Sequence, residues 1–174
     1  MKRKIAIALD WDDVVAPLNQ VAVDLYNERN GTDMKLERIK KWTDGERFLR
    51  DIYLDLELYR RQKPDPAFLK VIPKLQKIGN VYIASNPYPQ HYEIRREQIH
   101  RFFPSIPDPK IRLGPGKETI PYTFLLDDND VTVGRSNARV PVCFGQPWNR
   151  EYEGNRVKDA YQFLDLIERF LSRP

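Results

Sequence analysis

The sequence predicts an α/β fold in which a parallel sheet carries helices on both faces. Short apolar runs typical of buried strands alternate along the chain with stretches of helical spacing. Three of these runs end in polar side chains, and ligands of such sheets bind at the carboxyl ends of the strands. The 174 residues suit one compact domain, which we expect over 1–174.

The first strand is expected at Ile5–Leu9, where five apolar residues run directly into Asp10. Helical spacing follows over 17–29 and again in a longer helix with apolar residues from Phe48 to Tyr59, opened by a capping box at 43–46. A parallel crossover needs only one helix. We therefore expect a helical cap over about 17–63, and a core made of about 1–16 and 64–174.

The rest of the chain continues the alternation of helices and strands. Pro66 opens a helix that ends at Gly79, and Pro73 should kink or split it. The elements expected after it are a strand at 81–84, a helix at 91–103, a weaker strand at 110–113, strands at 122–126 and 140–144, and a final helix at 156–172.

Composition limits the classes of function. With 29 basic and 25 acidic residues, the net charge of +4 favours anionic ligands without indicating a nucleic-acid-binding protein. The single cysteine, Cys143, excludes a disulfide within the chain and is expected to be a buried thiol. No apolar stretch reaches the length of a membrane span, and the first run is too short for a signal peptide. We expect a cytoplasmic protein with no membrane partner.

The polar ends of the three strands predict a site for phosphate and metal. Carboxylates held together repel one another and raise each other's pKa unless a cation neutralises them. Mg²⁺ prefers such oxygen ligands and shares its shell with phosphate. A lysine could neutralise the remaining charge: Lys117 in a glycine-rich turn is the first candidate and Lys110 the alternative. The strand ends are Asp10/Asp12, Ser85/Asn86 and Asp127/Asp128.

Four segments, in order, resemble the motifs of the haloacid dehalogenase superfamily. The run Asp10-Trp11-Asp12-Asp13-Val14-Val15 resembles the first motif, Ser85 the second, Lys117 the third and Leu126-Asp127-Asp128 the fourth. The resemblance covers almost the whole chain. It implies a Rossmann-like, haloacid-dehalogenase-like fold and a Mg²⁺-dependent phosphomonoester hydrolase.

The resemblance also implies residue roles. Asp10 would be the nucleophile that forms an aspartyl-phosphate, and Asp12 the general acid and then base. Mg²⁺ would be held by Asp10, Asp127 and Asp128 and by the backbone carbonyl of Asp12. Ser85 and Lys117 would bind the phosphoryl group, whereas Asn86 could contact phosphate or only shape the turn before Pro87. One of Asp127 and Asp128 could instead cap a helix.

Within the superfamily, the helical insertion and Ser85-Asn86-Pro87 resemble the 5′(3′)-deoxyribonucleotidase group, as does, loosely, the segment 146–149. The resemblance implies a nucleoside monophosphate as substrate. Alternatives are a 3′-phosphatase on nucleic-acid ends, a phosphatase of sugars or other metabolites, and a phosphate-binding protein without activity. The group usually has glycine where this chain has Asp13. Oligomeric state is left open, a dimer included.

Several other side chains are expected to be structural. His91 and His100 lack a metal-like partner and suit surface or capping positions. The pair Arg95-Arg96, with Arg101 nearby, is expected on a solvated helix face. Trp11 should pack rather than react. The cap aromatics Trp42, Phe48, Tyr53 and Tyr59 are expected to be mostly core, although one or two could stack on a base.

Overall fold

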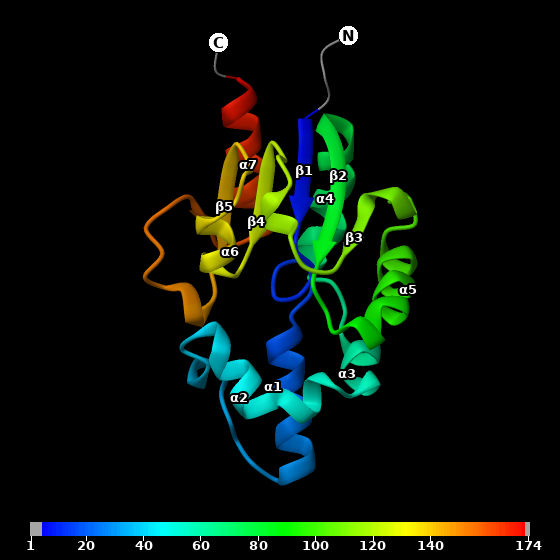
Figure 1. The fold of residues 1–174 in the computed structure, drawn as a ribbon, viewed down its shortest axis with the longest axis vertical. Helices are drawn as coiled ribbons and strands as arrows, with labels where there is room; N and C mark the ends of the chain where they lie inside the picture. The colour runs from blue at the N-terminus through cyan, green and yellow to red at the C-terminus, as the bar shows by residue number, and fades with distance from the viewer. Residues whose placement is uncertain (1–4, 173–174) are drawn as a thin grey trace.

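The fold is known from a computed structural model, which describes residues 5–172 and contains one parallel sheet of six strands (Figure 1). The strand order is β3-β2-β1-β4-β5-β6, and every neighbouring pair is parallel. This confirms the predicted sheet. The strands are β1 (Ile5–Leu9), β2 (Gly79–Ser85), β3 (Ile111–Leu113), β4 (Phe124–Asp127), β5 (Val140–Phe144) and β6 (Arg156–Val157).

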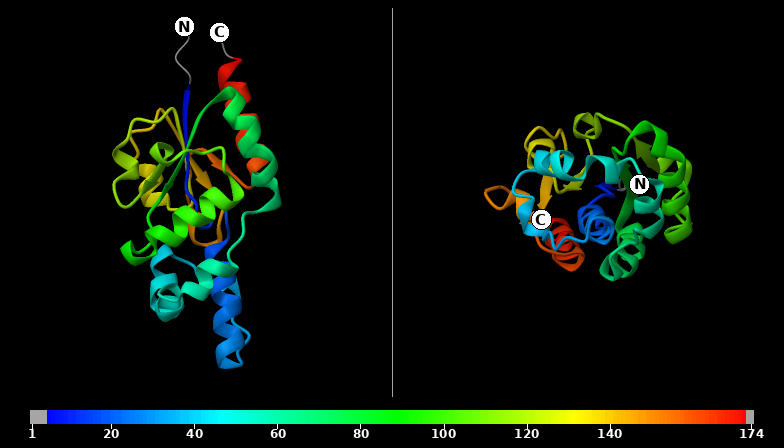
Figure 2. Two further views of the ribbon diagram at one scale, coloured as in Figure 1. Left: turned by 90° about the vertical axis from the view of Figure 1, so that its right-hand side faces the viewer. Right: turned by 90° about the horizontal axis from the view of Figure 1, so that it is seen from below.

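Helices cover both faces of the sheet, as predicted (Figure 2). Helices α4 (Pro66–Ile78) and α7 (Ala160–Leu171) pack together on one face, while α6 (Asp130–Gly134) packs against β4 and β5 on the other. Helix α5 (Tyr92–Phe102) lies near the β3 edge and contributes Ile99 to the same core as α4. The sheet is therefore the middle layer of three.

The β1 strand lies in the middle of the sheet because its residues are apolar on both faces. Ile7 and Leu9 belong to the large core that contains the apolar sides of α4 and α7. Ala8 points to the opposite face and packs in a smaller cluster with Leu125 and Tyr122. Both neighbours, β2 and β4, hydrogen-bond to β1, so that its carboxyl end is flanked by theirs.

Three helices between β1 and α4 form a separate layer beyond the carboxyl edge of the sheet (Figure 1). They are α1 (Leu18–Asn30), α2 (Trp42–Tyr53) and α3 (Leu56–Arg61). Their apolar residues make a hydrophobic cluster distinct from the core of the sheet, with Leu25, Leu49 and Leu58 among its fully buried members. We therefore propose that residues 17–63 form the cap.

The long helix expected over 43–59 is wrong, because the chain forms two helices there. The Asp55 carboxylate accepts the backbone N–H of Glu57 and so caps the start of α3. The predicted capping box is also displaced: the Asp44 carboxylate accepts the N–H groups of Lys40 and Lys41, each at 2.9 Å, and α2 begins at Trp42.

Two further expectations differ from the structure, and two short elements were not expected. Helix α4 is not split at Pro73. It continues through this residue, which lies on its exposed side, where water can hydrate the carbonyl that proline leaves unbonded. The final helix begins at Ala160, after the Asp159 cap, because Arg156 and Val157 pair with β5 as β6. The sequence did not predict α6 or β6, which are too short to show periodicity. Among the described helices, none is long and apolar enough to cross a membrane.

Candidate active site

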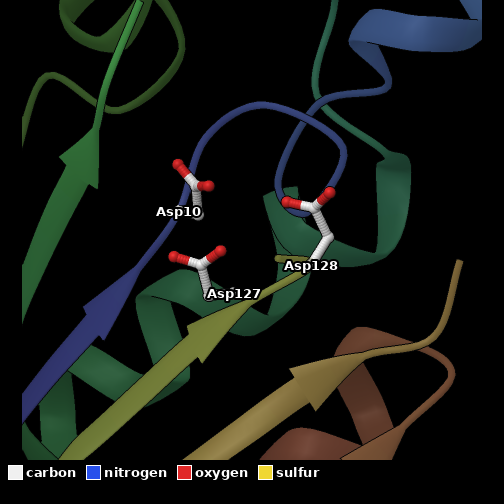
Figure 3. A group of neighbouring side chains, drawn as sticks. All are labelled: Asp10, Asp127 and Asp128. Carbon is white, nitrogen blue, oxygen red and sulfur yellow. The ribbon is translucent and has the colours of Figure 1, made fainter. Parts of the chain in front are cut away.

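Three acidic side chains meet at the carboxyl edge of the sheet (Figure 3). Leu9 in β1 pairs with Leu126 in β4, so the next residues, Asp10 and Asp127, are neighbours. Asp128 follows directly. One carboxylate oxygen from each of the three acids lies within 4.8 Å of the others, and all three residues are buried. The parallel register, rather than closeness in sequence, brings them together.

Lys117 reaches this acidic cluster from the loop before β4. Its Nζ lies 2.5 Å from Oδ2 of Asp10 and 2.7 Å from Oδ2 of Asp127. Gly116 holds the turn with a φ of 90°, in the left-handed region that favours glycine. The alternative, Lys110, donates instead to Oδ1 of Asn80 at 3.0 Å, near the opposite end of β2. Lys117 is therefore the lysine of this site.

Burial and charge together control ionisation here. Burial raises the pKa of Asp10 to about 7, although Lys117 opposes this shift. Burial also raises the pKa of Asp128 well above its usual value, and the charge of Asp13 adds to the effect. For Lys117, burial acts to lower the pKa, but the carboxylates of Asp10 and Asp127 outweigh it and raise the pKa. Each of these carboxylates would be stabilised in its charged form by an added cation.

The acidic cluster fits a hard divalent cation. It offers carboxylate oxygens alone, the donor type that Mg²⁺ takes, and one lysine does not balance three buried carboxylates. Neither Asp127 nor Asp128 caps α6, because the side chain of Asn129 accepts the N–H groups of Val131 and Thr132. Both acids therefore stay available to a cation.

The segment after β5 braces Asp128 and Asp13. The indole Nε1 of Trp148 donates to Oδ2 of Asp128 at 2.9 Å, and the Asn149 amide donates to the Asp128 carbonyl at 2.7 Å. The Gln146 amide donates to the backbone carbonyl of Asp13 at 2.6 Å. This loop thus holds two separate segments of the site in place.

Asp13 has a backbone conformation that favours glycine. Its φ is 57°, which aspartate tolerates better than most residues. Its buried carboxylate accepts the Asn19 backbone N–H at 2.8 Å and the Asn19 amide at 2.7 Å. Asn19 in turn accepts a hydrogen bond from the Tyr53 hydroxyl. Asp13 therefore connects the loop after β1 to helices α1 and α2.

Asp12 lies in the same loop and contacts three side chains. Its Oδ1 accepts from Arg95 Nη2 at 2.5 Å and from Gln62 Nε2 at 2.9 Å. Its Oδ2 accepts from the Ser85 hydroxyl at 3.3 Å. Asp12 and Asn86 both line the cavity described below. Because the Ser85 hydroxyl donates to Asp12, the segments that resemble the first and second motifs are in contact.

The expectation of a solvated Arg95 is wrong. Its side chain is completely buried, whereas Arg96 is exposed and pairs with Asp108. Arg95 shares one face of α5 with Gln98 and Ile99, at the spacing i, i+3, i+4. That spacing was the available sequence signal, since an arginine on the apolar face of a helix is buried with it.

The histidines differ from each other. His91 is buried and its ring packs 4.4 Å from that of Tyr59, so the surface position expected for it is wrong. It does occupy the N-cap position of α5, the alternative expected for it, although its side chain makes no capping hydrogen bond. His100 pairs with Asp108 on the exposed surface, as expected. Trp11 is fully buried, as expected.

A cavity of about 420 Å³ lies between the acidic cluster and helices α1, α2 and α3. Its size suits a small-molecule ligand. Tyr53 and Tyr59 are buried as expected, but Trp42 is 50% exposed because it stands at the first turn of α2, at the side of the cavity. Besides Asp10 and Asp128 of the cluster, the residues that line it include Leu18, Asn19, Glu46, Asn86, Pro87, Tyr88 and Thr132.

Comparison with known proteins gives one family and a set of related folds. Residues 3–171 match the family described as 5′ nucleotidase, deoxy (pyrimidine), cytosolic type C protein. No curated protein matches the chain at a significant level.

Several solved structures share the fold. A haloacid dehalogenase-like protein of unknown function from Agrobacterium tumefaciens has 15% identity and a TM-score of 0.61, covering 97% of this chain and 99% of its own. A putative haloacid dehalogenase-like hydrolase from Burkholderia xenovorans has 11% identity and a TM-score of 0.60, covering 98% and 100%. A hydrolase of the haloacid dehalogenase-like family from Streptococcus pneumoniae has 12% identity and a TM-score of 0.60, and the match covers 96% of this chain and 100% of its own.

Proposed function

We propose that this chain is a Mg²⁺-dependent nucleotidase acting on nucleoside monophosphates. The chain belongs to the family described as 5′ nucleotidase, deoxy (pyrimidine), cytosolic type C protein, and it is a phosphatase of the haloacid dehalogenase superfamily. The observation that carries the proposal is the position of Asp10. Its carboxylate lies at the edge of the cavity, 2.5 Å from Lys117 and beside Asp127.

Asp10 is the proposed nucleophile. Its oxygen attacks phosphorus, the bond between phosphorus and the ester oxygen breaks, and the leaving oxygen takes a proton from Asp12. Water then gives a proton to Asp12 and attacks the aspartyl-phosphate, which releases inorganic phosphate and restores Asp10. Lys117 offsets the repulsion between the anionic nucleophile and the anionic phosphate. Ser85 and Asn86 are proposed to bind the phosphoryl oxygens.

The carboxylates of Asp10, Asp127 and Asp128 and the backbone carbonyl of Asp12 are the proposed Mg²⁺ ligands. When bound, the ion supplies positive charge to the phosphoryl oxygens. Without it, the buried carboxylates face one another with Lys117 as the nearby cation. Burial, to which the charges of neighbouring carboxylates add, raises the pKa of Asp10 and of Asp128, and a bound cation would oppose these shifts.

The cavity supports a substrate with one phosphate and an aromatic group. Lys117 is the one basic residue among the described residues that line the cavity, so a second phosphate would find no cation there. Aromatic side chains offer faces on which a nucleobase could stack. The aromatic residues of the lining are Trp42, Tyr53, Tyr59 and Tyr88.

The test is a screen for phosphate release with nucleoside 5′- and 3′-monophosphates, sugar phosphates and a 3′-phosphorylated oligonucleotide. We expect a nucleoside monophosphate to have the highest kcat/KM, with activity lost in EDTA and restored by Mg²⁺. A higher kcat/KM for the oligonucleotide or a sugar phosphate would replace the nucleotidase with one of those phosphatases. Phosphate binding without turnover of any substrate would contradict catalysis.

The cellular location is proposed from the family. Its description names cytosolic proteins, and we propose that this chain is cytoplasmic as well. Cell fractionation followed by immunoblotting tests this location, and recovery in the membrane fraction would contradict it.

A further inference from the structure

The guanidinium of Arg95 is buried directly against Asp12. Its side chain is 0% exposed, and Nη2 lies 2.5 Å from Oδ1 of Asp12. A buried charge is costly unless charged and polar partners replace the lost water. No other carboxylate of the described residues forms an ion pair with Arg95. The ion pair with Asp12 therefore stabilises the buried charge of this arginine.

Neighbouring side chains fix the orientation of the guanidinium. Its Nη1 donates to Oε1 of Gln62 and to Oε1 of Gln98, both at 2.8 Å. The rings of Trp11 and Tyr59 lie 5.5 Å and 5.1 Å from its central carbon. A planar group held by hydrogen bonds within its plane and packed against two rings has one preferred orientation.

The two carboxylate oxygens of Asp12 consequently differ. Oδ1 accepts from both Arg95 and Gln62, at 2.5 Å and 2.9 Å. Oδ2 accepts one longer hydrogen bond, from the Ser85 hydroxyl at 3.3 Å. A carboxyl group can keep accepting at Oδ1 while Oδ2 carries a proton. Oδ2 therefore keeps more of its bonding capacity free for a substrate than Oδ1 does.

We propose that Arg95, assisted by Gln62, is a positioning residue that holds Oδ1 of Asp12 so that Oδ2 exchanges the proton with the substrate. The inference rests on the proposed function, which makes Asp12 the acid and base. In the first step the electron pair of the broken phosphorus–oxygen bond stays on the leaving oxygen. That oxygen takes the proton from Oδ2, which leaves Asp12 as a carboxylate.

The leaving group provides a readout that a merely structural role would not move. A nucleoside leaves as an alkoxide and needs the proton, whereas p-nitrophenolate is stable enough to leave without it. The value of kcat/KM reports the steps up to the first irreversible one, which include loss of the leaving group. A misplaced Asp12 should therefore slow the nucleotide reaction far more than the p-nitrophenyl phosphate reaction.

The experiment compares Arg95→Met with Arg96→Met, which changes the exposed arginine next to it on α5. For Arg95→Met we expect kcat/KM for the preferred nucleoside monophosphate to fall about 100-fold, and for p-nitrophenyl phosphate less than about 5-fold. Arg96→Met should change neither by more than about 2-fold. Circular dichroism and thermal melts in the same buffer check that each variant is folded.

Gln62→Leu is the second variant, and it decides the matter if Arg95→Met does not fold. It removes one donor from Oδ1 and should lower kcat/KM for the nucleotide about 10-fold, again with a smaller effect on the aryl ester.

An equal loss on the two substrates, or no loss on either, overturns the role of Arg95 while leaving the proposed function intact. Wild-type protein that hydrolyses neither substrate contradicts the proposed function itself, and the positioning role with it.

Discussion

Replacing Asp10 with asparagine should have opposite effects on activity and on stability. The change removes the proposed nucleophile, so phosphate release should be abolished. It also removes a buried acid whose pKa is raised to about 7, mainly by burial, with Asp127 and Asp12 adding to the shift and Lys117 opposing it. An amide of nearly the same shape has no charge to bury.

The size of the stability effect follows from that pKa. The folded state binds the Asp10 proton more tightly than the unfolded state, whose value is 3.8, so stability is lost as pH rises between the two. The full difference corresponds to about 4 kcal/mol, of which about 3 kcal/mol falls between about pH 4.5 and about pH 8. The asparagine side chain does not titrate, so the variant should gain about that much relative to wild type over this range.

The assay is urea unfolding in EDTA at both pH values, for wild type, Asp10→Asn and the control Asp24→Asn. Asp24 is an exposed carboxylate on α1, and its replacement should show no comparable pH dependence. EDTA is essential, because a bound cation would stabilise the ionised carboxylate. A relative gain below about 1 kcal/mol for Asp10→Asn would refute the claim that Asp10 is destabilised by burial.

Three further predictions concern the metal, the lysine and the core. Mg²⁺ at about 100 times its Kd should raise the Tm of the metal-free protein by about 5–11 °C, and Asp128→Asn should reduce this rise, measured by thermal shift, below about 2 °C; an unchanged rise would contradict the cation site. Lys117→Met should lower kcat/KM about 10²–10³-fold in a phosphate-release assay, whereas Lys110→Met, which alters a lysine bonded to Asn80, should stay within about 2-fold; similar losses would contradict the assignment. Phe163→Ala should cost about 3–5 kcal/mol in urea unfolding because Phe163 is fully buried against Phe124, and the exposed Tyr161→Ala on the same helix less than about 1 kcal/mol; equal costs would place Phe163 outside the core.

Elements with strong local signals could be predicted from the sequence. The β1 strand is an unbroken apolar run directly before Asp10, and α1 ends just before Gly31, whose φ of 60° favours glycine. Elements that depend on a distant partner could not be predicted. Strand β6 is two residues long, and it forms because Arg156 and Val157 pair with β5. The break before α3 was hidden because apolar residues continue across it.

The proposed catalytic residues were found from the sequence because a parallel sheet places the ends of its strands together. Asp10, Ser85 and Asp127 each lie at the carboxyl end of an apolar run, and a correct assignment of the strands brought them to one edge. The side chains of Arg95 and Trp148, which hydrogen-bond to Asp12 and Asp128, could not be predicted in this way. Arg95 lies far from Asp12 along the chain, in a segment that resembles no motif. Trp148, which bonds Asp128, lies in the segment 146–149, whose resemblance to the deoxyribonucleotidase group is loose.

The sequence by itself determined the parallel sheet, the helical insertion after the first strand and the acids at the strand ends, because apolar periodicity and short motifs are local properties. Tertiary structure decided which lysine serves the site: Lys117 reaches Asp10, while Lys110 bonds Asn80 near the opposite end of β2. It also gave Asp13 its bonds to Asn19 on α1. The physical reason is that the partner of a buried charge depends on how helices and strands pack, and a local pattern contains no information about that packing.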